Sequence, residues 1–320
     1  MTPRALICAA FLAASSFLPG ASAGAAEPLR VVASLQPLYS IVSALAQGAN
    51  IEAKAVPAAL PGLAELPRAM ARLSAAEADI LGKADAVVSI PSIWPEDPSF
   101  REARARNIRI VQVDAARSLG KGAASVMLTQ TPVSNVDWRV AAQDRLPSPY
   151  VWFSPANAIR MAEIVADDLK RLSPDDAAQI ETNLKSFTRD IQALRAEFDA
   201  KFLQLEDPQV FALTDRFVYL TNDLGLFISG YFLEDDLRWS PGDLAAFSSF
   251  LSARGVKRVI HHWRPSDEIV AEIARAGAQL VILDDGEGSS HGASGRPDPG
   301  RYLSILRGDL QALHDALSTP

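Results

Sequence analysis

The chain has 320 residues, of which 48% are hydrophobic, and its 31 basic and 38 acidic side chains give a formal net charge of −7. This apolar share is ample for a sizeable core, and the negative charge argues against a nucleic-acid-binding surface. The single cysteine, Cys8, lies in the leader segment described next, so a disulfide or a cysteine metal site is excluded from the rest of the chain.

The first 26 residues have the pattern of a cleaved export signal. Arg4 supplies a positive charge, residues 5–17 form an apolar run, and small residues at 21–26 offer cleavage positions. The run is shorter than the ~20 apolar residues that a membrane-spanning helix needs. We therefore expect removal of residues 1–26 and a periplasmic location. A lipid anchor at Cys8 is the less favoured alternative, because Cys8 precedes most of the apolar run.

Beyond the leader, short runs rich in β-branched residues alternate with helical patterns, which is typical of parallel α/β layers. Strands are expected at residues 29–33, 86–90, 108–113, 210–213, 258–261 and 280–283. Amphipathic helices are expected at residues 38–47, 244–253 and 267–276. The predicted fold class is α/β, with two lobes of mainly parallel sheets flanked by helices.

A long helical segment joins the two halves. It starts at Ser154-Pro155, a favourable cap followed by proline, and from residue 177 apolar residues recur every three or four positions. The stripe continues for about 30 residues, which as one helix would measure roughly 45 Å. We assign residues 27–153 to an N-terminal lobe, 154–206 to a helical connector and 207–320 to a C-terminal lobe. A coiled-coil dimer is the alternative; a monomer is favoured because the stripe falls between two α/β halves.

Several stretches then carry a family resemblance. They are VVASLQPLYSIVSALAQG at the mature start, ADAVVSI at 84–90, YVWFSPANAIRMAEIVADDL at 150–169, VILDD at 281–285 and YLSILRGDLQALHDAL near the C-terminus. In this order they resemble the cluster A-I periplasmic metal-binding proteins, the zinc and manganese receptors of ABC importers. The resemblance implies delivery of a transition-metal ion, as cargo, to an ABC permease and ATPase at the inner membrane, with no organic cofactor.

The resemblance also implies where the ion would bind, since such receptors hold it between the lobes, with imidazoles for zinc and added carboxylates for manganese. The first ligand position falls near Ala69, with Glu65 and Arg68 close by. Tyr150 and Tyr231 occupy the second and third positions, where the family has histidine or glutamate. Most of the expected histidine ligands are therefore replaced.

Asp284 matches the fourth ligand position, an acid after the last inner strand, and Asp285 stands beside it. The chain has four histidines, none of them in the first lobe, so an ordinary histidine-rich zinc site is disfavoured. His262 ends a second-lobe strand and is the imidazole that we add to the candidates. The predicted metal set is Asp284, Tyr150, Tyr231 and His262.

Three interpretations of the cleft remain open. Tyrosine and carboxylate donors would favour a hard ion such as ferric iron, because only a strong Lewis acid lowers a phenol pKa enough for tight binding. Alternatively, the site takes an organic ligand or a metal chelate, with substrate-binding candidates Trp94, Trp152, Glu65, Arg68, Arg216 and Asp285. Each tryptophan is equally well explained as a core residue. The third interpretation is a solute-free adhesion or regulatory protein of the same fold.

An enzyme is not expected. The sequence contains no Gly-rich phosphate loop, Gly-x-Ser-x-Gly elbow or His-Glu-x-x-His motif. The acidic trio at residues 234–236 is better explained as a solvated face than as catalytic carboxylates.

Overall fold

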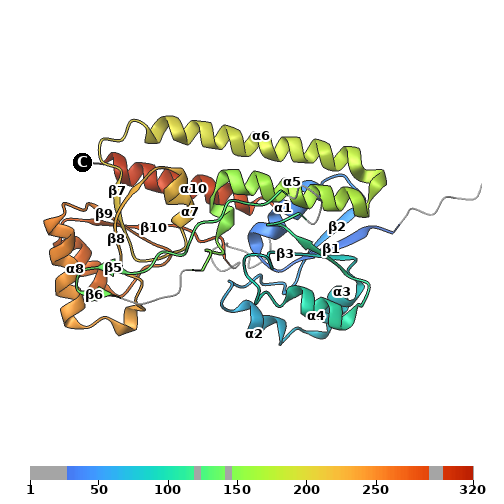
Figure 1. Ribbon diagram of the computed structural model, residues 1–320, viewed down its shortest axis with the longest axis horizontal. Coiled ribbons are helices and arrows are strands. Elements are labelled where there is room, and N and C mark those ends of the chain that lie inside the picture. Colours follow the sequence, from blue (N-terminus) through green and yellow to red (C-terminus); the bar gives the residue numbers. More distant parts are fainter. Residues whose placement is uncertain (1–26, 119–123, 141–145, 288–297, 320) are drawn as a thin grey trace, which may run out of the picture.

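The computed structural model describes residues 27–118, 124–140, 146–287 and 298–319. Two lobes, each built on a four-stranded sheet, lie side by side beneath one long helix (Figure 1). The predicted export signal, residues 1–26, lies outside the described residues. No described helix is long and apolar enough to cross a membrane.

The first lobe contains a parallel sheet with the strand order β2-β1-β3-β4. Its strands are β1 (Leu29–Ala33), β2 (Ile51–Ala55), β3 (Ala86–Ser89) and β4 (Val111–Asp114), and its helices are α1 (Gln36–Ala46), α2 (Leu66–Met70), α3 (Ala75–Lys83) and α4 (Ser99–Arg106). The central strands carry Val31, Val32, Val87 and Val88, all at most 1% exposed. Such continuous apolar strands are typical of parallel sheets that helices cover on both faces.

The second lobe repeats this topology. Its strands, in the order β10-β9-β7-β8, are all parallel. They are β7 (Gln209–Ala212), β8 (Phe227–Tyr231), β9 (Arg258–His261) and β10 (Gln279–Ile282), accompanied by α7 (Val218–Asp223), α8 (Pro241–Ala253), α9 (Asp267–Arg275) and α10 (Arg301–Ser318). A short helix, η3 (Asp236–Arg238), precedes α8. The expected α/β class with two parallel-sheet lobes is confirmed.

The connector forms as the sequence indicates. It comprises α5 (Pro155–Leu172), η2 (Pro174–Asp176) and α6 (Ala177–Phe202), and the short helix η1 (Val151–Phe153) precedes it. The Ser154 hydroxyl accepts the Asn157 N–H at the start of α5, with Pro155 in the first turn. The 26 residues of α6 cover about 39 Å and run along both lobes (Figure 1). Its apolar stripe, including Ile180, Ile191 and Phe198, is buried within this chain.

Two strands of the four-stranded sheets, β2 and β8, were not expected from the sequence, and both lie at sheet edges. In β2, Glu52 and Lys54 interrupt the apolar pattern and pair with each other at 2.6 Å. In β8, Gly230 breaks the β-branched run because a Cβ there would come within 2.8 Å of the Phe211 ring. Edge strands have one unpaired side and need less apolar character than central strands, so composition did not reveal these two, although it did indicate the edge strands β4 and β10.

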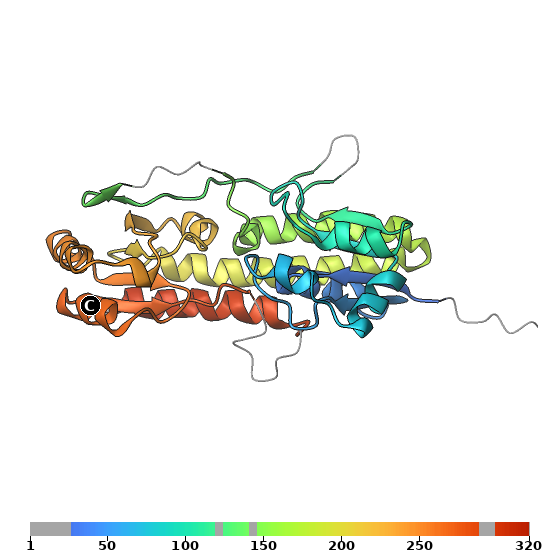
Figure 2. The same cartoon turned by 90° about the horizontal axis from the view of Figure 1, so that it is seen from below.

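A short hairpin forms a second crossing between the lobes. The sequence places residues 134–140 in the first lobe, but β5 (Asn135–Val136) and β6 (Arg139–Val140) lie against the second lobe (Figure 2). The Asn135 carboxamide oxygen accepts the Tyr231 N–H at 2.6 Å, at the end of β8. Trp138 packs edge-on against Phe232 and Phe250, with ring centroids 5.5 and 5.4 Å apart. The connector is therefore not the only link between the lobes.

Replacing Trp138 by alanine should lower the free energy of unfolding by roughly 2–3 kcal/mol, because half-buried ring contacts are lost from the second lobe. Urea unfolding followed by circular dichroism measures the change. Trp263→Ala is the matched control, since Trp263 is 44% exposed and its loss should cost less. Equal effects of the two variants would contradict a stabilising role for the hairpin.

Candidate functional site

An arginine and two carboxylates form the centre of the candidate site between the lobes. Arg216 follows β7, and Asp285 and Glu287 follow β10, so all three lie beyond the carboxyl ends of parallel strands. One guanidinium nitrogen, Nη1, pairs with Asp285 Oδ2 at 2.5 Å and with Glu287 Oε2. The three side chains are only 19%, 9% and 7% exposed. Many α/β proteins bind ligands just beyond the carboxyl ends of their parallel strands.

The first lobe completes the cluster. The backbone N–H of Leu63, in the loop before α2, donates to Glu287 Oε1 at 2.9 Å. Beside it, Gly62 leaves no room for a side chain, because a Cβ would lie 2.7 Å from Glu287 and 3.1 Å from the carboxylate of Glu65. The Arg216 guanidinium also lies 5.3 Å from the centre of the Tyr150 ring, within cation–π range. The cluster therefore contacts both lobes at once.

Burial controls the protonation of the groups around Arg216. It raises the pKa of the Tyr150 phenol well above its ordinary value, and the negative charge of Glu287 adds to the rise. Burial likewise raises the pKa of Glu287, opposed by the charge of Arg216, and that of Asp215. A phenol of ordinary pKa is already neutral at neutral pH, and this burial makes the phenolate form of Tyr150 still less accessible.

Asp284, the inherited ligand position, points elsewhere. Its Oδ2 pairs with Arg301 at 3.1 Å, and its Oδ1 accepts the Gly286 N–H at 3.0 Å. Its backbone N–H donates to Asp309 on α10 at 2.8 Å. The carboxylate is thus engaged by the first turn of α10 rather than by the Arg216 cluster. Its role as a metal ligand stays a prediction.

The other two predicted metal ligands are also separate from the cluster's ion pairs. Tyr231 ends β8, and burial raises its pKa while a hydrogen bond with Thr221 opposes the rise. His262 follows β9 and is buried beside His261, with the two Nδ1 atoms 3.1 Å apart. Within the described ranges, no group of three or more histidine, cysteine or acidic side chains could hold a metal ion.

The predicted substrate-binding residues divide into two groups. Arg216 and Asp285 are in the cluster, and Glu65 lies at its edge. The others lie outside it: Arg68 is exposed, Trp94 packs on the first-lobe core, and Trp152 is buried. Trp152 nevertheless contacts the site indirectly, since its ring lies edge-on to Tyr150 with centroids 5.6 Å apart.

Glu287 is the residue that sequence reasoning missed. It stands in the Gly/Ser-rich stretch from 286 to 300, whose composition predicts a surface loop, yet its side chain is 7% exposed. Its place just after Asp284 and Asp285, past a strand end, is the signal that could have indicated it. Residues 288–297 of that stretch lie outside the described part of the chain.

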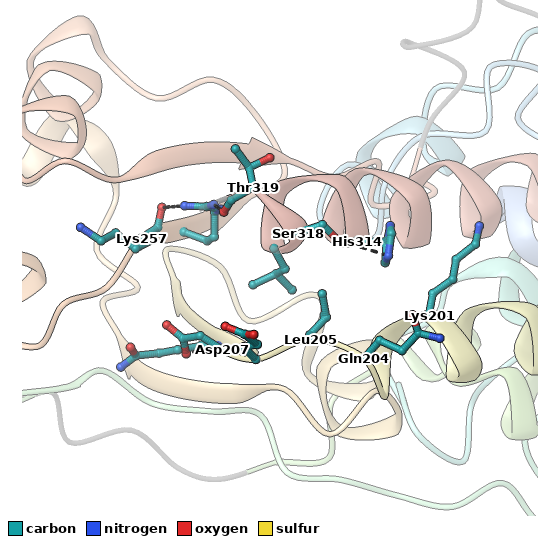
Figure 3. Close-up of a pocket in the computed structure, with 12 residues that line it drawn as sticks. Lys201, Gln204, Leu205, Asp207, Lys257, His314, Ser318 and Thr319 are labelled. Carbon is teal, nitrogen blue, oxygen red and sulfur yellow. Dashed lines mark hydrogen bonds between the residues drawn. The ribbon is translucent and has the colours of Figure 1, made fainter.

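A separate hollow lies at the far end of the second lobe. It measures about 520 Å³ and is surrounded by Lys201, Lys257, His314 and Thr319, among others (Figure 3). Its wall includes Arg258, whose guanidinium donates to the carbonyls of Ala316 and Thr319 at the end of α10. Because α10 spans 18 residues, or about 27 Å, this hollow is well removed from Asp284 at the other end of the helix.

Comparison with known proteins identifies the family. Residues 31–316 match the family described as "Zinc-uptake complex component A periplasmic". The chain belongs to this family. The match includes both lobes, the connector and the Arg216 cluster, so the resemblance seen in the sequence is confirmed.

Individual relatives match a smaller part of the chain than the family model does. The chain is 28% identical over 180 residues to the high-affinity zinc uptake system protein ZnuA of Paracoccus denitrificans, covering 53% of this chain and 51% of that protein. It is 25% identical over 169 residues to the zinc-binding lipoprotein AdcA of Streptococcus pneumoniae, covering 52% of this chain and 33% of that protein. The matched regions thus span a third to a half of these relatives.

Solved structures support the fold over nearly the whole chain. A mutant of FpvC from Pseudomonas aeruginosa superimposes with a TM-score of 0.73 at 21% identity, covering 91% of this chain and 100% of that one. At this identity the likeness establishes the two-lobed architecture, and the chemistry of the site has to be argued from this chain's own residues.

His261 provides a pH test of the site's electrostatics. Burial and the charge of Arg216 lower its pKa from 6.5 to about 4. Between pH 6.5 and 4, His261 is therefore protonated in the unfolded chain but mostly neutral in the native state. The free energy of unfolding consequently falls by about 3 kcal/mol as the pH falls through this range. His261→Asn should remove this part of the acid destabilisation in urea unfolding at pH 4.5 and 7. His314→Asn, on α10, should keep the wild-type slope; identical slopes for all three proteins would contradict the prediction.

Proposed function

We propose that the protein is an exported solute-binding protein that captures cargo between its lobes and delivers it to an ABC permease and ATPase at the inner membrane. Membership of a periplasmic zinc-uptake family supports this role. The signal pattern of residues 1–26 supports the location. The observation that carries the proposal is a polar cluster at strand ends that both lobes build together, through Arg216, Glu287 and the Leu63 N–H.

We also propose that the ligand set is divergent. A transferable zinc site needs three or four imidazole, thiolate or carboxylate donors about 2.0–2.3 Å from the ion. At the expected positions this chain has Tyr150, Tyr231 and Asp284, and Asp284 is paired with Arg301. The Paracoccus relative is named for zinc uptake, but the residues here argue against free zinc held in the usual way.

A metal chelate or small organic ligand is the second candidate cargo. Arg216 favours it, because a guanidinium between the lobes can bind a ligand carboxylate with two hydrogen bonds. Tyr150 adds an aromatic face next to that guanidinium. A chelate that carries carboxylates around a metal would offer Arg216 the partner that a bare cation cannot.

Metal titration tests the divergent site. Protein purified from the periplasm without chelator is expected to contain little zinc and to show no sub-micromolar affinity for Zn²⁺ in isothermal titration calorimetry. Ferric citrate should instead quench tryptophan fluorescence through Trp152, whose ring lies beside Tyr150. Sub-micromolar zinc binding that His262→Ala abolishes would overturn the divergent ligand set.

The transport role has a separate test. We expect genes for a permease and an ATPase beside the gene for this chain, and those two proteins, reconstituted in proteoliposomes, should hydrolyse ATP faster when the mature protein is added. Boiled protein serves as the control for nonspecific effects. No stimulation with or without ferric citrate, or the absence of such genes, would count against an importer receptor and favour the solute-free interpretation.

A further inference from the structure

We propose that Arg216 is a built-in counter-cation, which occupies the acid pair Asp285 and Glu287 and keeps this inter-lobe site closed to free metal cations. The inference rests on the proposed receptor function and specifies what its site excludes. It assigns to one side chain the position that a cationic cargo would otherwise take.

The geometry of the ion pair supports this assignment. A single nitrogen, Arg216 Nη1, bridges Asp285 Oδ2 and Glu287 Oε2. A divalent ion between two acidic ligands makes the same kind of bridge. Unlike an ion, the guanidinium is covalently attached and stays charged at all physiological pH values, because arginine does not deprotonate in proteins. The guanidinium therefore competes with free cations for the two carboxylates. Because it is tethered to the chain, its effective concentration beside them does not fall on dilution.

The neighbouring acid is neutralised in the same manner. Asp284 Oδ2 pairs at 3.1 Å with Arg301, whose side chain is 9% exposed. The three acidic side chains that directly follow β10, Asp284, Asp285 and Glu287, are therefore all paired with arginines of this chain. In a receptor that gathers free cations, such acids would have to be available as ligands.

Arg216 also links the lobes while it fills the site. Through Glu287 it is connected to the Leu63 N–H of the first lobe, and its guanidinium lies over Tyr150. Removing the guanidinium would leave two buried carboxylates next to each other. Buried like charges are strongly unfavourable unless a proton or another cation joins them. The vacated site would then favour a hard divalent ion, since carboxylate oxygens are its preferred ligands.

Arg216→Met tests the inference with Mn²⁺ as the probe. Free Mn²⁺ is counted by electron paramagnetic resonance, and melting temperatures are measured with and without the ion. The wild type should show no saturable Mn²⁺ binding up to millimolar concentrations. Arg216→Met should melt roughly ten degrees lower in chelator, because it strands buried charges. It should bind Mn²⁺ saturably and recover part of that loss when the ion is added.

Companion variants separate charge from folding. Arg216→Lys keeps a cation and should exclude Mn²⁺ as the wild type does, whereas the double variant Arg216→Met with Glu287→Gln should lose the gained binding. Arg139→Met is the matched control, since Arg139 also bridges two carboxylates, Asp243 at 3.2 Å and Glu234 at 3.0 Å, away from this site. It should gain no Mn²⁺ binding. If Arg216→Met does not fold, Arg216→Gln takes its place, with the same gain expected.

Two results would overturn the inference. One is saturable Mn²⁺ binding by the wild type that Glu287→Gln abolishes, since Arg216 would then not exclude the ion. The other is a folded Arg216→Met protein that binds no Mn²⁺. Neither result touches the transport role, which the stimulation of ATP hydrolysis decides independently.

Discussion

The ion pair of Arg216 with Asp285 and Glu287 connects the chemistry of this protein to its architecture. The three side chains come from two strand ends of the second lobe, and a backbone N–H of the first lobe donates to Glu287. All three side chains are largely buried. Replacing any one of them by a neutral residue would therefore leave an unpaired charge in the protein interior. The cluster consequently connects the two lobes, and we propose that it also limits which ligands the space between them accepts.

The scaffold brings these groups together through repetition. Both lobes use the same strand order, so each presents the carboxyl ends of its strands at a sheet edge. The helix α6 and the hairpin of β5 and β6 then link the lobes at separate places. With more than one link, the lobes have less freedom to move apart than a single flexible hinge would allow.

Sequence patterns were informative where a structure depends on local chemistry. The apolar central strands, the Ser154 cap and the long stripe of α6 were all predictable, since each follows from propensity and periodicity. The edge strands β2 and β8 were not predictable, because Lys54 in β2 and Gly230 in β8 interrupt the apolar, β-branched pattern that indicates a strand. The hairpin was missed for another reason. Its Trp138 packs against Phe232 and Phe250, which are so distant in the sequence that no local pattern indicates the contact.

For the site, the sequence by itself determined which donors exist: the single cysteine Cys8, four histidines, and tyrosines where the family resemblance implies imidazoles. That inventory already argued against an ordinary zinc receptor. Only the tertiary structure decided the ion pairs, in which Arg216 pairs with Asp285 and Glu287, and Arg301 pairs with Asp284. The reason is physical: a charge in the sequence has no partner until folding removes water and sets distances, and only then can an arginine stand where an ion would bind.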